Sequence, residues 1–99
     1  MTKDTSSGNV SNKTPTVIMY TRGFCGYCSA ARKLLKSKGV EFADLDTTLN
    51  AKLRREMMDR SGRQTVPQIF IGATHVGGYD DLAALDKAGK LNDLLGLDN

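Results

Sequence analysis

The segment TRGFCGYCSAARKLL, residues 21–35, contains both cysteines of the chain, Cys25 and Cys28, with two residues between them. The preceding TVIMYT, residues 16–21, is a short apolar run, partly β-branched, and is typical of a strand buried on both faces. After the cysteines, apolar residues recur at helical spacing up to Leu35, and charged residues occupy the opposite face. The sequence therefore predicts that the two thiols lie where a buried strand ends and an amphipathic helix begins.

The remaining sequence predicts three more strands and two more helical regions. VEFADLD, residues 40–46, alternates like a strand, and the helix before it favours a parallel pair with the first strand. Residues 49–60 have the pattern of a second amphipathic helix. QIFI at 68–71 and THVG at 74–77 are separated by a glycine-containing turn, which predicts a hairpin. A last helical region follows, with a break near Gly89.

The predicted order is β-α-β-α-β-β-α, with a parallel pair first and a hairpin after it. This order predicts an α/β fold, a four-stranded mixed sheet with helices on both faces. A C-x-x-C motif beside a βαβ pattern independently indicates a thioredoxin-like redox fold. The length of 99 residues fits one domain, which is enough to bury a modest core without staples.

The composition is that of an ordinary globular domain, with 39% hydrophobic and 25% charged residues. The net charge of +3 comes from interspersed charges of both signs, which argues against a nucleic-acid partner. No apolar run approaches the roughly 20 residues of a membrane span, and no secretory signal is visible. Residues 1–14 are polar and patternless, so we expect a flexible tail before a domain at residues 15–99. Two cysteines make a poor disulfide scaffold, so we expect a cytoplasmic, reducing compartment.

The position of the cysteines predicts reactivity. Free N–H groups of the first helical turn and the helix dipole favour a thiolate at Cys25, which lowers its pKa. Cys28 lies one turn further on, within reach of a disulfide, so that one sulfur can attack and the other can resolve. Two alternatives are a pair of buried structural cysteines and half a zinc site. The zinc alternative lacks ligands, since His75 is the only histidine; we interpret it as a surface strand residue.

Three motifs follow one another along the chain: YTRGFCGYC at residues 20–28, SGRQTVPQIFIG at 61–72 and HVGGYDDL at 75–82. Together they resemble the dithiol (class I) glutaredoxins. The resemblance implies a thioredoxin-like fold and glutathione-dependent reduction of protein–glutathione mixed disulfides and protein disulfides. It implies that Cys25 is the attacking nucleophile and Cys28 the resolving thiol.

The resemblance also implies where glutathione binds. Arg22, before the motif, corresponds to a basic position near the glycine carboxylate of glutathione and the active thiolate. Tyr27 lines the groove. Arg54 corresponds to a polar position that also faces the glycine carboxylate. Arg54 and Arg63 can equally be solvated charges at the ends of a helix.

Other implied contacts come from the second and third motifs. Thr65 and Val66 precede the family's cis-proline, here Pro67, and the Val66 backbone would pair with the tripeptide like an added strand. Gly78 and Asp80 correspond to the corner that holds the γ-glutamyl end. Asp80 can also serve as a helix N-cap, a role compatible with ligand binding.

One departure from the family pattern suggests a second function. Many members have proline where this chain has Gly26. Some glutaredoxins without that proline bind a [2Fe-2S] cluster between two chains, each giving its first cysteine and a bound glutathione. The resemblance therefore leaves open a cluster-bound dimer that uses Cys25. The reductase form would be a monomer with glutathione as co-substrate, glutathionylated or disulfide-bonded proteins as partners, and no tightly bound cofactor or metal.

Overall fold

The computed structural model describes residues 15–97; the tail expected at residues 1–14 lies outside the described residues, as do residues 98 and 99. The described elements are, in chain order, β1 (Val17–Thr21), α1 (Gly26–Ser37), β2 (Ala43–Asp46), α2 (Ala51–Ser61), β3 (Gln68–Ile71), β4 (Thr74–Gly77), α3 (Tyr79–Lys87) and α4 (Leu91–Leu95). The predicted order is confirmed, and the last helical region is divided at Gly89, whose φ is +76°. Within the described range, no helix combines the length and the apolar character needed to cross a membrane.

The strands form one mixed sheet in the order β2-β1-β3-β4. β1 and β2 are parallel, with Ile18 opposite Ala43, and α1 is the crossover between them. β3 runs antiparallel to β1 and forms a hairpin with β4. The parallel pair and the hairpin predicted from the sequence are both confirmed.

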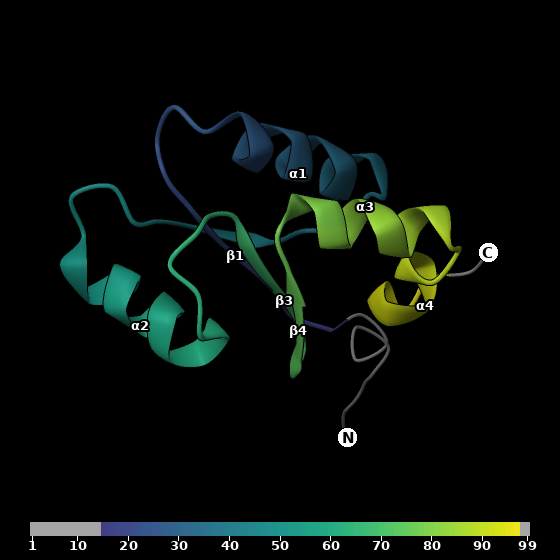
Figure 1. Cartoon of the computed structure of the whole chain (residues 1–99). Helices are drawn as coiled ribbons and strands as arrows, with labels where there is room; N and C mark the ends of the chain where they lie inside the picture. The colour runs from purple at the N-terminus through teal and green to yellow at the C-terminus, as the bar shows by residue number, and fades with distance from the viewer. Residues whose placement is uncertain (1–14, 98–99) are drawn as a thin grey trace, which may run out of the picture.

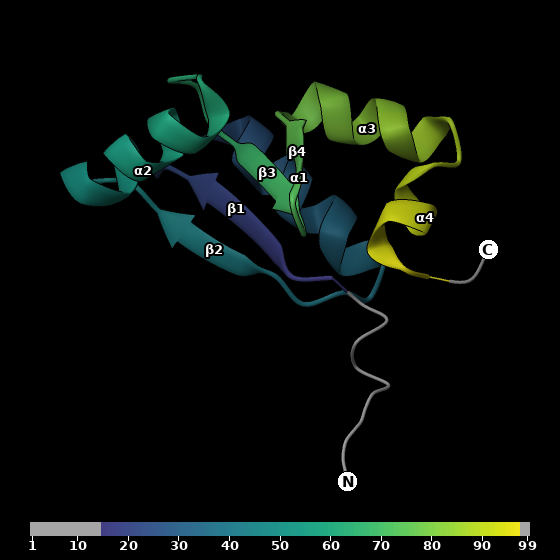
Figure 2. The ribbon, with the colours of Figure 1, turned by 90° about the horizontal axis from the view of Figure 1, so that it is seen from below.

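Helices cover both faces of this sheet, with α2 on one side and α1 and α3 on the other (Figure 1). On the side of α1, α3 and α4, Met19 and Leu35 belong to the larger buried cluster. On the side of α2, Tyr20, Met57 and Phe70 form a second cluster. Neighbouring residues of β1 thus serve opposite faces, because side chains alternate along a strand. Figure 2 shows β1, β2 and β3 side by side, with α2 beyond their ends.

Two element boundaries differ from the sequence-based expectation. The second helix begins at Ala51, because Asn50 is its N-cap and its side chain accepts a backbone N–H of the first turn at 3.0 Å. Leu49, expected inside this helix, is fully exposed and has a positive φ of 57°. The second strand was expected at residues 40–46, but its pairing with β1 begins only at Ala43.

The sheet brings three distant segments together at one end. β1 and β3 are antiparallel, so the C-terminal end of β1 lies beside the N-terminal end of β3. β4 is antiparallel to β3 and therefore ends at the same place. The segments that adjoin these ends contain Cys25, residues 62–67 and Gly78. The topology alone thus gathers the three sequence motifs.

Candidate active site

Cys25 occupies the N-cap position of α1, directly after the β1 connection. Its backbone is extended, with φ −119° and ψ 109°, and its carbonyl oxygen accepts the N–H of Ser29 at 3.1 Å. The backbone N–H of Cys28 donates to the Cys25 Sγ, with 3.3 Å between nitrogen and sulfur. The sulfur therefore takes the place of the oxygen that usually caps a helix, and the predicted contact between helix and sulfur is present.

The surroundings drive the pKa values of the two thiols apart. Burial alone would raise the pKa of Cys25, but hydrogen bonds from the Cys28 side chain and from the backbone N–H groups of Cys28 and Tyr27 outweigh it. Together with the positive charge of Arg22 they lower the pKa of Cys25. Burial, followed by the hydrogen bond to Cys25, raises the pKa of Cys28 to about 12. Both cysteines are free, so the site pairs an accessible, activated sulfur with a fully buried thiol.

A groove of about 230 Å³ lies beside the cysteine motif. Its lining residues are Tyr27, Arg63, Thr65, Val66, Pro67, Gly78, Tyr79, Asp80 and Asp81. The carbonyl oxygen of Val66 lies 4.0 Å from the Cys25 Sγ, and the Val66–Pro67 peptide bond is cis. The groove therefore unites residues from all three motifs next to the reactive sulfur, including most of the positions expected to bind glutathione.

Two expected residues lie outside the lining of this groove. Arg22 is exposed immediately before the cysteine loop, and its charge acts on the Cys25 sulfur. Arg54 is exposed on α2. Neither has a hydrogen bond or ion pair to another side chain of residues 15–97, so both guanidinium groups are available to an anionic ligand.

The groove also contains residues that were not expected to line it, among them Arg63 and Asp81. The carboxylate of Asp81 accepts the N–H of Gly78 at 3.0 Å and pairs with Arg63 at 3.4 Å. Gly78 is the N-cap position of α3, so Asp81, and not Asp80, supplies the capping carboxylate. A side chain at Gly77 would place its Cβ 2.2 Å from Asp81 Oδ2, and the φ of Gly77 is +113°, so this corner requires glycine.

Two aromatic rings border the groove. Tyr27, from the first turn of α1, and Tyr79, from the first turn of α3, have ring centroids 6.3 Å apart at an interplanar angle of 27°. Tyr27 is largely exposed, at 63%, although it is a large aromatic residue. The family resemblance implied that Tyr27 lines the groove. Its stacking partner Tyr79 could not be identified without the packing of α1 against α3.

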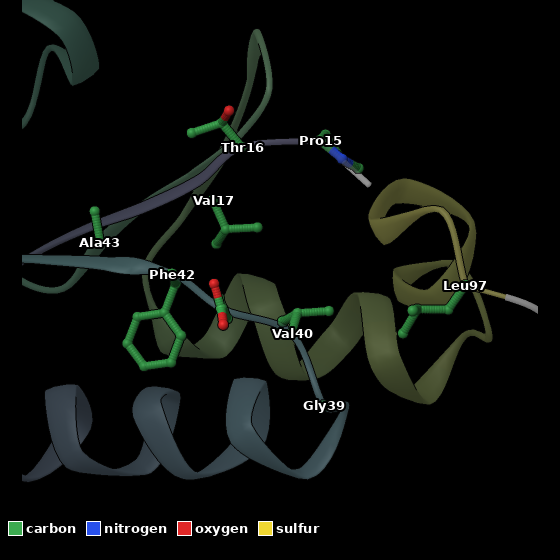
Figure 3. A pocket seen from close by; sticks show the side chains of 9 residues that line it. Pro15, Thr16, Val17, Gly39, Val40, Phe42, Ala43 and Leu97 are labelled. Atoms are coloured by element: carbon green, nitrogen blue, oxygen red, sulfur yellow. The ribbon is translucent and has the colours of Figure 1, made fainter. Parts of the chain in front are cut away.

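The largest of the described cavities lies elsewhere, and Glu41 is the one ionisable residue in its lining (Figure 3). It measures about 660 Å³ and adjoins the start of β1, the opposite end of that strand from Cys25. Val17, Val40, Phe42 and Leu97 give it an apolar lining without a cysteine or histidine. Cavity size alone therefore does not locate the chemistry. Among residues 15–97, no group of three or more His, Cys, Asp or Glu side chains could hold a metal ion.

Comparisons with known proteins show which family this chain is similar to. The family model described as Glutaredoxin matches residues 17–76. Glutaredoxin 3 of Escherichia coli strain K12 is 57% identical over 79 residues, which cover 80% of this chain and 95% of that protein. The crystal structure of a buckwheat glutaredoxin–glutathione complex is 28% identical, with a TM-score of 0.73, and the match covers 85% of this chain and 78% of that one. A structure named "Metal Binding of Glutaredoxins" is 53% identical, with a TM-score of 0.66 and coverage of 86% and 92%.

Proposed function

Because this chain belongs to the glutaredoxin family of glutathione-dependent thiol oxidoreductases, we propose that it reduces protein–glutathione mixed disulfides and protein disulfides through Cys25. The observation that carries the proposal is the contrast between the two sulfurs. Cys25 is partly exposed with a lowered pKa, and Cys28 is buried with a pKa of about 12. Only a thiolate is an effective nucleophile toward a disulfide, so Cys25 is the attacking sulfur.

The reaction with a mixed disulfide has two exchanges. The Cys25 thiolate attacks the glutathione sulfur, a Cys25–glutathione disulfide forms, and the protein substrate leaves as a thiolate that takes up a proton. The thiolate of a second glutathione then attacks the bound glutathione sulfur, releasing oxidised glutathione and restoring the Cys25 thiolate. The net exchange consumes one glutathione thiol: the mixed disulfide and the second glutathione become the protein thiol and oxidised glutathione.

Cys28 offers a second route for the same intermediate. After losing its proton, the Cys28 sulfur attacks the Cys25 sulfur, glutathione leaves, and the internal disulfide forms. A pKa of about 12 leaves very little Cys28 thiolate at neutral pH. The negative charge of Cys25 contributes to that high pKa and is lost once Cys25 is bonded to glutathione. Formation of the Cys25–glutathione disulfide therefore removes one of the causes that keep Cys28 protonated, which favours its attack on Cys25.

We assign glutathione to the groove beside Cys25. The Val66 backbone would pair with the tripeptide, because the residue adjoins both the sulfur and the groove. Asp80 would bind the ammonium group, since its carboxylate has no hydrogen bond or ion pair within the described part of the chain. Arg22 and Arg54 are exposed cations that fit the glycine carboxylate. We further propose that residues 15–99 hold the whole activity and that the protein works in the cytoplasm.

A glutathione-linked reductase assay tests this function. Cys25→Ser should abolish reduction of a glutathione mixed disulfide, because no other accessible thiol exists. Cys28→Ser should retain much of the activity, because release by a second glutathione needs only Cys25. As a control, the same unfolding measurement is made on both variants and should show that both are folded. Comparable loss in the two variants would reject the assigned division of labour.

A cluster-bound dimer is a second candidate. It is supported by the relative whose structure is named for metal binding, and by Gly26, where a Cβ would meet no atom within 4 Å. Gly26 is the first residue of α1, a position at which proline is well tolerated. Gly26→Pro should therefore keep the fold and the reductase activity while suppressing the cluster. Anaerobic reconstitution with iron, sulfide and glutathione should give a coloured dimer; a colourless monomer would contradict this function.

A further inference from the structure

A buried glutamine connects the glutathione groove to β4. Gln68 is the first residue of β3 and has 0% exposure, so its amide must find partners within the protein. Its Nε2 donates to the carbonyl oxygen of Thr65 at 3.0 Å and to the Thr65 Oγ1 at 3.1 Å. Its Oε1 lies 2.7 Å from Nε2 of His75. The Gln68 amide is thus fully engaged between the groove and a single histidine.

These contacts determine which atoms carry hydrogen. A flipped amide would place the Gln68 oxygen against the Thr65 carbonyl oxygen, and two acceptors cannot bond. The Gln68 Oε1 can only accept, so the His75 Nε2 must donate. Burial and the charge of Arg63 lower the pKa of His75, while Asp81 opposes them. The histidine is accordingly a neutral ring with its proton on Nε2.

Packing against Phe70 holds the His75 ring in the position from which its Nε2–H donates to Gln68. His75 is the cross-strand partner of Phe70, and their ring centroids are 4.7 Å apart at 26°. The guanidinium of Arg60 lies 4.3 Å from the same Phe70 ring centroid. The imidazole is therefore oriented by stacking on Phe70 and by its place on β4. The groove segment at residues 63–67 belongs to no helix or strand and has no such support.

We propose that His75 is a positioning residue of the glutathione site, acting through Gln68 on Thr65. The inference rests on the proposed function. Thr65 is exposed. Among residues 15–97, Gln68 is the one side chain that forms hydrogen bonds with Thr65, and it forms two. They hold the segment that carries Val66 beside Cys25. Without the His75 donor, the buried Gln68 oxygen would lack a partner and the amide would turn, releasing Thr65.

Two substitutions separate the effect of the His75 N–H donor from the effect of the His75 ring. His75→Phe keeps a ring on Phe70 and removes the N–H. His75→Gln restores an N–H near the position of Nε2. We expect His75→Phe to raise the KM for a glutathione mixed disulfide about tenfold, the equivalent of one lost hydrogen bond to a buried group. Its kcat should stay within about twofold, because groove binding serves ground state and transition state alike. His75→Gln should recover most of the KM.

Controls distinguish positioning from loss of stability. Thr74→Val changes an exposed neighbour on β4 and should leave the KM unchanged. The alkylation pKa of Cys25 should be the same in all variants, since His75 does not contribute to it. A merely structural role would reduce the folded fraction, and hence kcat, at constant KM. An unchanged KM in folded His75→Phe would overturn the proposal.

An NMR measurement on the wild type is independent of the variants' folding. The carbon and nitrogen shifts of the His75 imidazole report which nitrogen carries the proton. We expect the Nε2–H form; an Nδ1–H tautomer would overturn the proposal, because it could not donate to Gln68. Absence of glutathione-linked turnover in the wild type would instead reject the proposed function and leave the tautomer result standing.

Discussion

Two identical thiols acquire opposite properties within one turn of helix. Cys25 lies at the N-cap, where N–H groups and the charge of Arg22 favour its thiolate. Cys28 lies inside the same turn, where burial and the neighbouring sulfur favour its thiol. Local sequence spacing predicted the first effect from the open N–H groups of a helix start. The second depends on what covers the helix, which spacing alone does not reveal.

Alkylation of the two cysteines should follow this difference. The rate for Cys25 should rise with pH through a midpoint below the roughly 8.5 of a free thiol, since only the thiolate reacts. Cys28 should stay unmodified in the folded protein, because it is buried and protonated. A pH–rate profile with peptide mapping measures both. A midpoint at or above the free-thiol value would show that the helix terminus does not activate Cys25.

At the scale of elements, the start of α3 assigns separate tasks to two adjacent carboxylates. Asp81 bonds to the Gly78 N–H, whereas Asp80 lines the groove without a partner among residues 15–97. From the sequence, Asp80 could be a cap, a ligand residue or both. The phase of the helix separates the two tasks, because the capping carboxylate belongs three residues after the N-cap.

Neutralising each carboxylate should therefore affect different quantities. Asp81→Asn should lower the free energy of unfolding by about 1 kcal/mol, because the cap and its attraction to the helix dipole are weakened. Asp80→Asn should leave stability within about 0.5 kcal/mol, as expected of an exposed site, and raise the KM for the glutathione mixed disulfide. Urea unfolding and steady-state kinetics on both variants check this. Equal stability losses would mean that Asp80 also caps the helix.

Much of the fold could be predicted because its signals are local. The apolar run of β1, the spacing of α1 and the glycine turn of the hairpin each lie within a few residues. The predicted start of the second helix was wrong by two residues, because Asn50 caps the helix and Leu49 is exposed to solvent. The link between His75 and Thr65 was not predictable, since Gln68 connects residues whose proximity depends on β3 and β4 pairing.

For the whole molecule, the topology explains how a small chain can bring three distant segments together in one site. One end of the sheet gathers the cysteine turn, the cis-proline segment and the Gly78 corner, while the two helical layers close the cores on each face. The resemblance implied a set of glutathione-binding residues, and the sheet order explains why most of them lie together. Arg63, Tyr79 and Asp81 join them through the packing of α3 and the α2–β3 connection.

Removal of residues 1–14 should leave function intact if residues 15–99 form the active domain. Every residue assigned to catalysis or glutathione binding lies between Arg22 and Asp80. A chain that begins with methionine before Pro15 should show the same kcat and KM as the full chain. Thermal unfolding should shift by no more than about 2 °C, which corresponds to a few tenths of a kcal/mol for a domain of this size. A larger loss of either would place part of the working domain in the removed segment.

The central claim is that Cys25 alone accepts glutathione from a mixed disulfide, and the intact mass of the reacted protein tests it most directly. Cys28→Ser, mixed with a glutathionylated protein and quenched with acid, should gain one glutathione, and peptide mapping should place it on Cys25. Cys25→Ser under the same conditions should gain none. A glutathione adduct on Cys28 in Cys25→Ser, formed as fast as that on Cys25, would contradict the account.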